Sequence, residues 1–257
     1  LRRIQQHDQD IFVLRGEGDP LTGGSPYAIL RTALRHFLLP LPIDEQPQSS
    51  AQHQLLDSIG NMLDGPNRQV QIAMLGELCG VPFPDENLPA LRAARKDPKI
   101  FGDQISEAVV RLLSGMSAHK PVLLVLEDLH WSDALSVKLL ATVLKELAEQ
   151  PILVLALARP EIHERFPRLW AGLRLREVVL SPVSKKASEK LIFAALGKGL
   201  SPDICSKLIE HSGGNPLYLE ELIRAAASGQ LDQHPPTILA LLQGRIGQLD
   251  PAARRVI

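Results

Sequence analysis

Apolar runs divide the first two thirds of the chain into alternating strands and helices. The most continuous run, residues 122–126, is wholly apolar and ends at Glu127 and Asp128. An apolar run without alternation is typical of a strand buried on both faces of a parallel sheet. A second such run covers residues 152–157 and a shorter one covers 11–14. Residues 174–180 alternate more weakly and predict a further strand.

Apolar positions at helical spacing predict helices between these strands. Ser25 is expected to cap the first helix, with Pro26 in its first turn. The proline-rich segments 39–50 and 81–98 are expected to be connections without regular structure. Helices are expected at residues 25–39, 51–78 with a break near Gly65, 100–116 and 135–147. Strands alternating with helices in this way indicate an α/β fold with a parallel sheet.

After Ser181 and Pro182 the pattern becomes helical only, with predicted helices at 184–196, 202–211, 216–227 and 236–246. We therefore expect an α/β core in residues 1–181 and an all-helical domain in residues 182–248. Because Asp250 and Pro251 suit the start of a helix, residues 249–257 are expected to begin a further helical or winged-helix domain.

Composition excludes several classes of protein. The 28 basic and 29 acidic residues give a net charge of -1, which does not favour a general binder of nucleic acid or membrane surfaces. Cys79 and Cys205 are far apart and show no metal-ligand spacing, so we expect reduced, mostly buried thiols in a cytoplasmic protein. We expect no signal peptide at the start of this sequence, and no apolar run reaches the roughly 18 to 20 residues that cross a bilayer.

Glu127 and Asp128 are candidate site residues because they follow directly on a buried strand. In open parallel sheets, ligands bind beyond the carboxyl ends of the strands. Two carboxylates placed there can hold a metal ion or polarise a water molecule. The alternative is a strand that leaves the core at a solvated turn. Asp133 is predicted to cap the next helix, so the unit is a strand, a short acidic loop and a helix.

Three segments resemble the signal-transduction ATPases with numerous domains (STAND). Within these, the chain is most similar to the AAA-type module fused to bacterial serine/threonine kinases, nucleotide cyclases and large LuxR-type regulators. Residues 123–133 (LLVLEDLHWSD) resemble the extended Walker B strand, 155–161 (LALARPE) the strand that ends in a sensor arginine, and 211–222 (HSGGNPLYLEEL) the helical-lid motif. Residues 14–27 are similar to the second-strand region. The resemblance implies a parallel-sheet P-loop NTPase core followed by an all-helical lid domain.

The resemblance also implies ATP and Mg²⁺ as ligands. In the family, the first Walker B acid holds Mg²⁺ and the second orients or deprotonates the attacking water. Glu127 and Asp128 correspond to these positions, and the chemistry suits carboxylates. Many ATPases have Asp followed by Glu, whereas this chain has the reverse order. Both acids are therefore candidate metal ligands and candidate catalytic residues.

Arg159 is the third candidate catalytic residue, because a guanidinium at the end of the neighbouring strand could contact a γ-phosphate. The alternative is a solvated arginine. Asn215 and Pro216 are the candidate nucleotide-binding residues of the lid, with Pro216 expected to contact the adenine. A local explanation is compatible with this role: a glycine pair ends one helix, Asn215 caps the next and Pro216 occupies its first turn. His130 and Trp131 match the family motif too, and packing is the favoured role for Trp131.

The chain departs from the family in one respect: it contains no Gly-x-x-x-x-Gly-Lys-Ser/Thr. That loop supplies the backbone amides and the lysine that bind a triphosphate. The glycine-rich run 15–24 lacks the Lys-Ser/Thr pair, and Gly197-Lys198 follows no strand. We expect residues 1–6 to be the end of the helix after the P-loop, and the missing lysine to lie roughly 10 to 25 residues upstream. The first strand and the P-loop would then be missing, and this chain alone would hydrolyse ATP poorly or not at all.

The main hypothesis is an ATP-binding and ATP-hydrolysing signalling switch of a multidomain regulatory protein, Mg²⁺-dependent, with the lid closing over the nucleotide. Expected partners are fused kinase, cyclase or DNA-binding domains and, depending on nucleotide, further copies of the protein. No direct contact with nucleic acid or membrane is expected from this segment. The alternative is a non-catalytic regulatory or protein-interaction scaffold of the same fold. A DNA-binding regulator is a third possibility, with its DNA contacts outside this segment because no basic stripe is present.

Overall fold

The chain divides into two compact units, residues 1–175 and 176–257. The computed structural model describes residues 11–21, 24–40, 47–197 and 199–228. The first unit contains all the described strands, and the described part of the second unit is helical. Among the described residues, no helix has the length and apolarity needed to cross a membrane.

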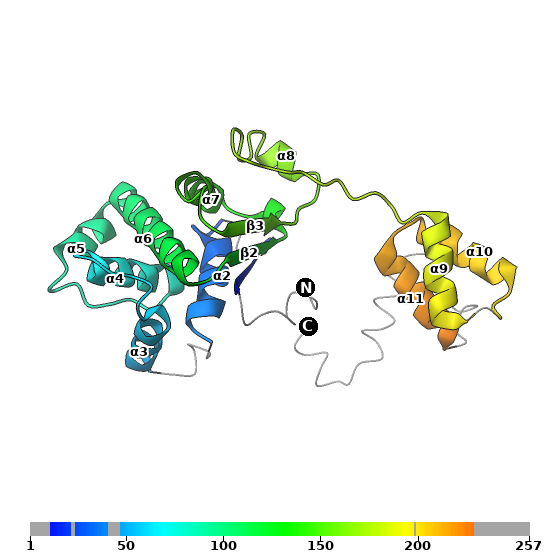
Figure 1. The fold of residues 1–257 in the computed structure, drawn as a ribbon, viewed down its shortest axis with the longest axis horizontal. Coiled ribbons are helices and arrows are strands. Elements are labelled where there is room, and N and C mark those ends of the chain that lie inside the picture. Colours follow the sequence, from blue (N-terminus) through cyan, green and yellow to red (C-terminus); the bar gives the residue numbers. More distant parts are fainter. Residues whose placement is uncertain (1–10, 22–23, 41–46, 198, 229–257) are drawn as a thin grey trace. The chain divides into compact units, whose positions relative to one another are not determined.

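The first unit contains a three-stranded parallel sheet, and most of its helices lie to one side of the strands (Figure 1). Its strands are β1 (Phe12–Glu17), β2 (Val122–Glu127) and β3 (Ile152–Ala156), in the order β1-β2-β3. The register places Glu17 opposite Glu127, so β1 and β2 end at the same level. The prediction of a parallel α/β fold is confirmed.

Helices follow and separate these strands as the apolar spacing predicted, and the short elements α5, η3 and α8 are additions to the prediction. Residues 81–98, expected to be a plain connection, contain a short helix that begins at a proline and buries Leu91 and Ala94. The unit contains α2 (Ala28–Leu38), α3 (Gln48–Ile59), α4 (Arg68–Cys79), α5 (Pro89–Lys96), α6 (Pro98–His119), the 3₁₀ turn η3 (Leu129–Trp131), α7 (Ala134–Glu146) and α8 (Ile162–Arg165).

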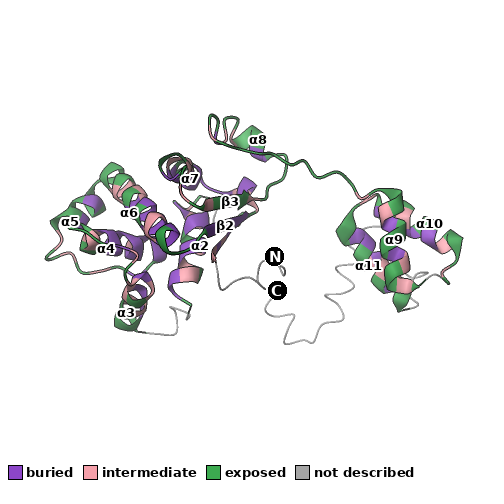
Figure 2. Ribbon diagram, in the orientation of Figure 1, coloured by how far each residue is buried: buried purple, intermediate pink, exposed green. Residues whose placement is uncertain are grey.

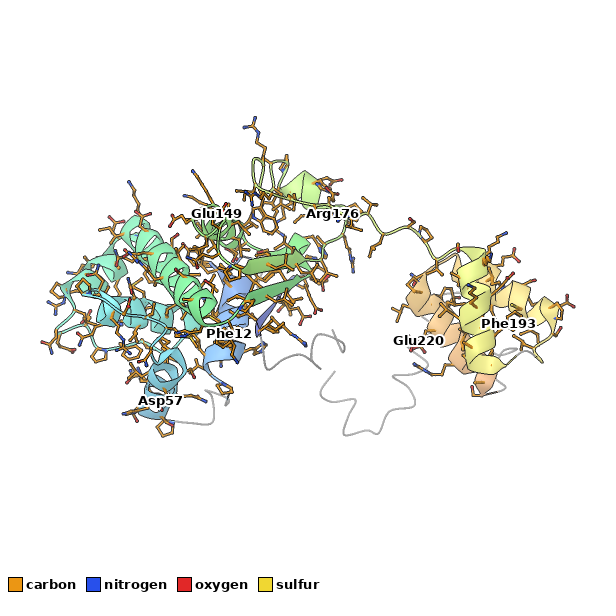
Figure 3. All side chains as sticks on the ribbon, in the orientation of Figure 1. Phe12, Asp57, Glu149, Arg176, Phe193 and Glu220 are labelled. Atoms are coloured by element: carbon orange, nitrogen blue, oxygen red, sulfur yellow. The ribbon has the colours of Figure 1, made fainter. Side chains whose placement is uncertain are left out.

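The largest apolar cluster takes its sheet residues from one face of the sheet. Leu14 of β1 and Leu124 of β2 occupy the same face and join one apolar cluster with the helices. Phe12, labelled in Figure 3, meets Phe37 of α2 edge-to-face with ring centroids 5.5 Å apart. Burial of this kind contributes on the order of 25 cal/mol per Å² of apolar surface, so this cluster stabilises the unit.

Strand β3 is not buried on both faces, contrary to the prediction. Leu153 and Leu155 are 65% and 45% exposed, whereas β2 is buried up to Leu126 (Figure 2). Among the described strands, β3 lies at the edge of the sheet, and only its inward-facing residues meet the core. The continuous apolar run therefore overstated the burial of β3.

The predicted strand at residues 174–180 is also wrong. This segment has no regular structure, and Val179 and Leu180 are more than four-fifths exposed. An alternating sequence forms a strand only when a neighbour supplies the hydrogen-bond ladder. None of the described strands pairs with it.

The second unit contains α9 (Lys185–Leu196), α10 (Pro202–Ser212) and α11 (Pro216–Ala227). Ile192, Leu208 and Leu219 bring the three helices together in a separate apolar cluster. These helices are as predicted. The helix predicted at 236–246, the domain start predicted at 249–257 and the helix end predicted at 1–6 lie outside the described residues.

The start of α2 differs from the prediction, because Ser25 does not cap it. Tyr27 precedes the helix in the left-handed region, with φ of 58°, and no side chain of that segment caps the first turn. The carboxylate of Asp133 instead accepts hydrogen bonds from the backbone amides of Tyr27 and Ala28, both at 3.0 Å. The same carboxylate caps α7, accepting from the Ser136 amide at 2.9 Å and the Ser136 hydroxyl at 2.6 Å. One buried side chain thus serves two helices.

We predict that Asp133→Ala destabilises the first unit by about 3 kcal/mol, because it removes a helix cap and also leaves two amides of another helix unpaired. Asp97→Ala is the matched control. Asp97 caps α6 from an exposed position, by accepting from the amides of Lys99 and Ile100. Its loss should cost only about 1 kcal/mol. Urea unfolding followed by tryptophan fluorescence measures both, since both tryptophans lie in this unit. Equal losses would contradict the dual role of Asp133.

Both cysteines are free and buried, as expected. Burial raises the pKa of the Cys79 thiol from its ordinary value of 9.0 to about 12. Since the thiolate is the nucleophile, a three-unit rise lowers its population at neutral pH roughly a thousandfold. We predict that iodoacetamide leaves Cys79 unmodified in the folded protein and labels it in urea. Rapid labelling of Cys79 without denaturant, detected by mass spectrometry, would contradict this.

Candidate functional site

Glu127 and Asp128 lie at the carboxyl end of the central strand. Glu127 is the last residue of β2 and is exposed. Asp128 follows in the left-handed region, with φ of 51° and ψ of 41°, and its side chain is 40% exposed. Left-handed backbone is uncommon for residues other than glycine, although Asp tolerates it better than most. The chain thus turns sharply at Glu127 and Asp128, which we call the acidic turn, and both carboxylates stay accessible.

The loop after β1 packs directly against this turn. The amide of Gly18 donates to the carbonyl oxygen of Glu127 at 2.9 Å. A Cβ on Gly18 would collide with the carbonyl oxygen of Asp128, and a Cβ on Gly16 would collide with that of Ile29. These glycines permit a close backbone approach. Nothing in the glycine-rich run itself indicated that it supports the acidic turn.

The end of β3 is joined to the same turn. The Leu129 amide donates to the Leu157 carbonyl at 2.9 Å, and the Leu157 amide donates to the Leu126 carbonyl at 2.8 Å. The chain then continues through Ala158 to Arg159. Parallel pairing therefore brings Arg159 beside the loop that carries Asp128, although the two residues are distant in sequence.

Arg159 contacts this loop in two ways. Its backbone amide donates to Nδ1 of His130 at 3.4 Å, and its guanidinium lies over the ring of Trp131, 5.5 Å from the centroid. A cation placed over an indole face is attracted by the quadrupole of the ring. Trp131 is therefore partly a packing residue, as favoured from the sequence, and also a platform that orients Arg159.

The acidic pair suits a magnesium ion bound together with a nucleotide better than a metal held by protein alone. Among the described residues, no cluster of three or more His, Cys, Asp or Glu side chains could hold a metal. Mg²⁺ usually takes one or two carboxylates and completes its shell with waters and substrate phosphates. Glu127 and Asp128 offer oxygen ligands of the kind that it prefers.

A groove of about 720 Å³ lies between α6 and α7, away from the acidic turn. Its lining does not include Glu127, Asp128 or Arg159. The groove carries charges of both signs, such as Lys99, Asp103 and Lys138. Volume alone would direct attention here, but the groove lacks convergent polar groups of one kind. The acidic turn, at the ligand-binding end of the sheet, remains the better candidate.

Asn215 and Pro216 lie in the second unit. The Asn215 side chain caps α11 by accepting from the Tyr218 amide at 3.1 Å, and Pro216 opens the helix in an exposed position. Gly213 and Gly214 have positive φ, and Gly214 packs closely on Pro182. The local explanation for this motif therefore holds, and the nucleotide-binding role of Asn215 and Pro216 stays a prediction.

Comparison of this chain with known proteins identifies its family. No solved structure matches the chain significantly. An uncharacterized protein of Rhizobium meliloti (strain 1021) is 26% identical over 129 residues, which make up 50% of this chain and 12% of that protein. The chain thus matches only a small part of that relative's length. The family model described as the AAA ATPase domain matches residues 1–155, which include β1, β2, the acidic turn and most of β3. Through that match over more than half its length, the chain belongs to the AAA ATPase domain family.

Proposed function

We propose that this chain binds and hydrolyses ATP as the switch module of a multidomain regulatory protein. The observation that carries the proposal is the acidic pair at the end of the central parallel strand, beside the end of β3 that leads to Arg159. Membership of the AAA ATPase domain family indicates nucleotide binding and ATPase-type chemistry. The signalling role and the assignment of residues are our inference.

In the proposed reaction, each acid has a role that its position allows. Exposed Glu127, at the end of β2, would hold Mg²⁺, which neutralises phosphate charge when it is bound. Asp128, one residue further, would orient or deprotonate the attacking water. Glu127 and Asp128 stand in the reverse of the common order of residue types, and the assignment rests on position rather than on residue type.

Arg159 would contact the γ-phosphate and so distinguish ATP from ADP. Its guanidinium is exposed and held over Trp131, which limits the directions in which it can point. Ordering an arginine before binding reduces the entropy that is lost on contact with phosphate. Asn215 and Pro216 would close over the base, with the exposed ring of Pro216 against adenine.

For the whole protein we propose only the kinds of domain that are joined to this module. The small share of the relative that this chain matches fits a module joined to other domains. We propose fused effector or sensor domains, such as kinase, cyclase or DNA-binding domains, and nucleotide-dependent self-association. Use of ATP and buried, unpaired thiols fit a cytoplasmic location.

We predict that Asp128→Asn lowers ATP turnover by at least about a hundredfold, the usual scale for loss of a positioned base. Glu127→Gln should also lower turnover, because it removes a carboxylate ligand of Mg²⁺. The assay uses the full-length protein, with phosphate release measured under saturating Mg²⁺ and ATP. Asp57→Asn and Glu149→Gln, which remove exposed carboxylates elsewhere in the unit (Figure 3), are matched controls and should retain activity. An Asp128→Asn protein that turns over at the unsubstituted rate would refute the catalytic assignment. ATP binding without turnover in the unsubstituted protein would favour the scaffold alternative.

We predict that Arg159→Ala weakens binding of ATP about tenfold and leaves ADP binding unchanged, because the lost charge-assisted contact is to the γ-phosphate alone. Titration with fluorescent nucleotide analogues measures both affinities. Arg174→Ala is the control, since Arg174 is an exposed arginine paired with Glu149. Equal losses for ATP and ADP would show that Arg159 does not discriminate between them.

A further inference from the structure

His130 lies at the junction between the acidic turn and the end of β3. Its ring is buried, with 6% of the residue exposed. Nδ1 accepts the Arg159 amide at 3.4 Å and lies 3.9 Å from Oδ1 of Asp128. Nδ1 of His130 thus lies near both Asp128, the proposed water-activating residue, and Arg159, the proposed γ-phosphate contact.

Neighbouring contacts fix the ring in this position. Trp131 packs against it, with ring centroids 4.7 Å apart. Nη1 of Arg165, in α8, donates to the His130 carbonyl at 3.0 Å. Since the His130 backbone and ring are both held, the position of Nδ1 is determined by the fold.

The second ring nitrogen argues against a purely structural role. Nε2 is buried and has no hydrogen-bond partner among the described residues. A buried polar atom without a partner lowers stability, so an apolar ring of similar shape would suit this position at least as well. Packing alone therefore does not account for an imidazole here.

We propose that His130 is a positioning residue that fixes Arg159 relative to Asp128. This proposal rests on the proposed ATPase function. By accepting the Arg159 amide, Nδ1 holds the chain after β3 against the acidic turn, so that water activation and γ-phosphate contact occur at a set separation. Placement errors of about 1 Å can lower enzymatic rates a hundredfold, which is why such a link matters.

Two substitutions separate the hydrogen bond from the packing. His130→Phe keeps a ring but removes the acceptor. His130→Asn keeps an oxygen acceptor close to the position of Nδ1. Four quantities are measured in the full-length protein: the melting temperature, the exchange of the Arg159 amide with solvent deuterium at single-residue resolution, kcat, and the ATP dissociation constant.

We expect His130→Phe to melt at or above the temperature of the unsubstituted protein, because the unpaired Nε2 is gone. The Arg159 amide should exchange faster in this variant, and kcat should fall about tenfold at unchanged ATP affinity. His130→Asn should restore both the slow exchange and most of kcat. A structural role alone predicts the opposite pattern, with lower stability and no selective loss of kcat.

The proposal is overturned if Arg159 exchanges equally in the unsubstituted and Phe proteins, or if faster exchange leaves kcat unchanged. It is also overturned if His130→Asn is as impaired as His130→Phe. Absence of turnover in the unsubstituted protein refutes the ATPase function, and with it any catalytic use of the link. The exchange data would still show whether the hydrogen bond exists, so the two failures can be distinguished.

Discussion

The buried carboxylate of Asp133 is the interaction on which the geometry of the first unit depends. It accepts the Tyr27 amide, 106 residues earlier in the chain, and caps α7 through Ser136. Burial and proximity to this carboxylate also raise the pKa of the Tyr27 hydroxyl, with burial the larger cause. Because α2 follows β1 and α7 follows β2, one side chain fixes the relative positions of two strand-to-helix connections. The acidic turn lies between β2 and this fixed point.

The candidate site is built mainly by the backbone. Gly18 contacts the carbonyl groups of the acidic turn from one side, and the end of β3 pairs with Leu129 from the other. Side chains then refine this arrangement, with His130 and Trp131 both contacting Arg159. A reactive group held by several independent backbone contacts is pre-organised, so little reorganisation is needed when a ligand arrives.

Sequence pattern predicted the elements well where burial alone decides them. The apolar run ending at Glu127 became a fully buried strand, and the helical spacing around Leu112 became α6. The pattern overstated the burial of β3, which pairs with a single described strand. It also predicted a strand at residues 174–180, which pair with none of the described strands. For the site, position at a strand end identified Glu127 and Asp128 as candidates, and the family resemblance of residues 155–161 added Arg159. The sequence did not reveal that Gly18 packs against the acidic turn, or that the Asp133 carboxylate accepts hydrogen bonds from the amides at the start of α2.

The sequence by itself determined most of the strands and helices, the parallel character of the sheet and the placement of two acids at a strand end. These follow from local periodicity and from the requirement that parallel strands be joined by crossovers. Only the tertiary structure decided which cap serves α2, how deeply β3 is buried and that His130 contacts both Asp128 and Arg159. These features arise between segments distant along the chain, where hydrogen-bond partners and solvent exposure are set by packing rather than by neighbouring residues.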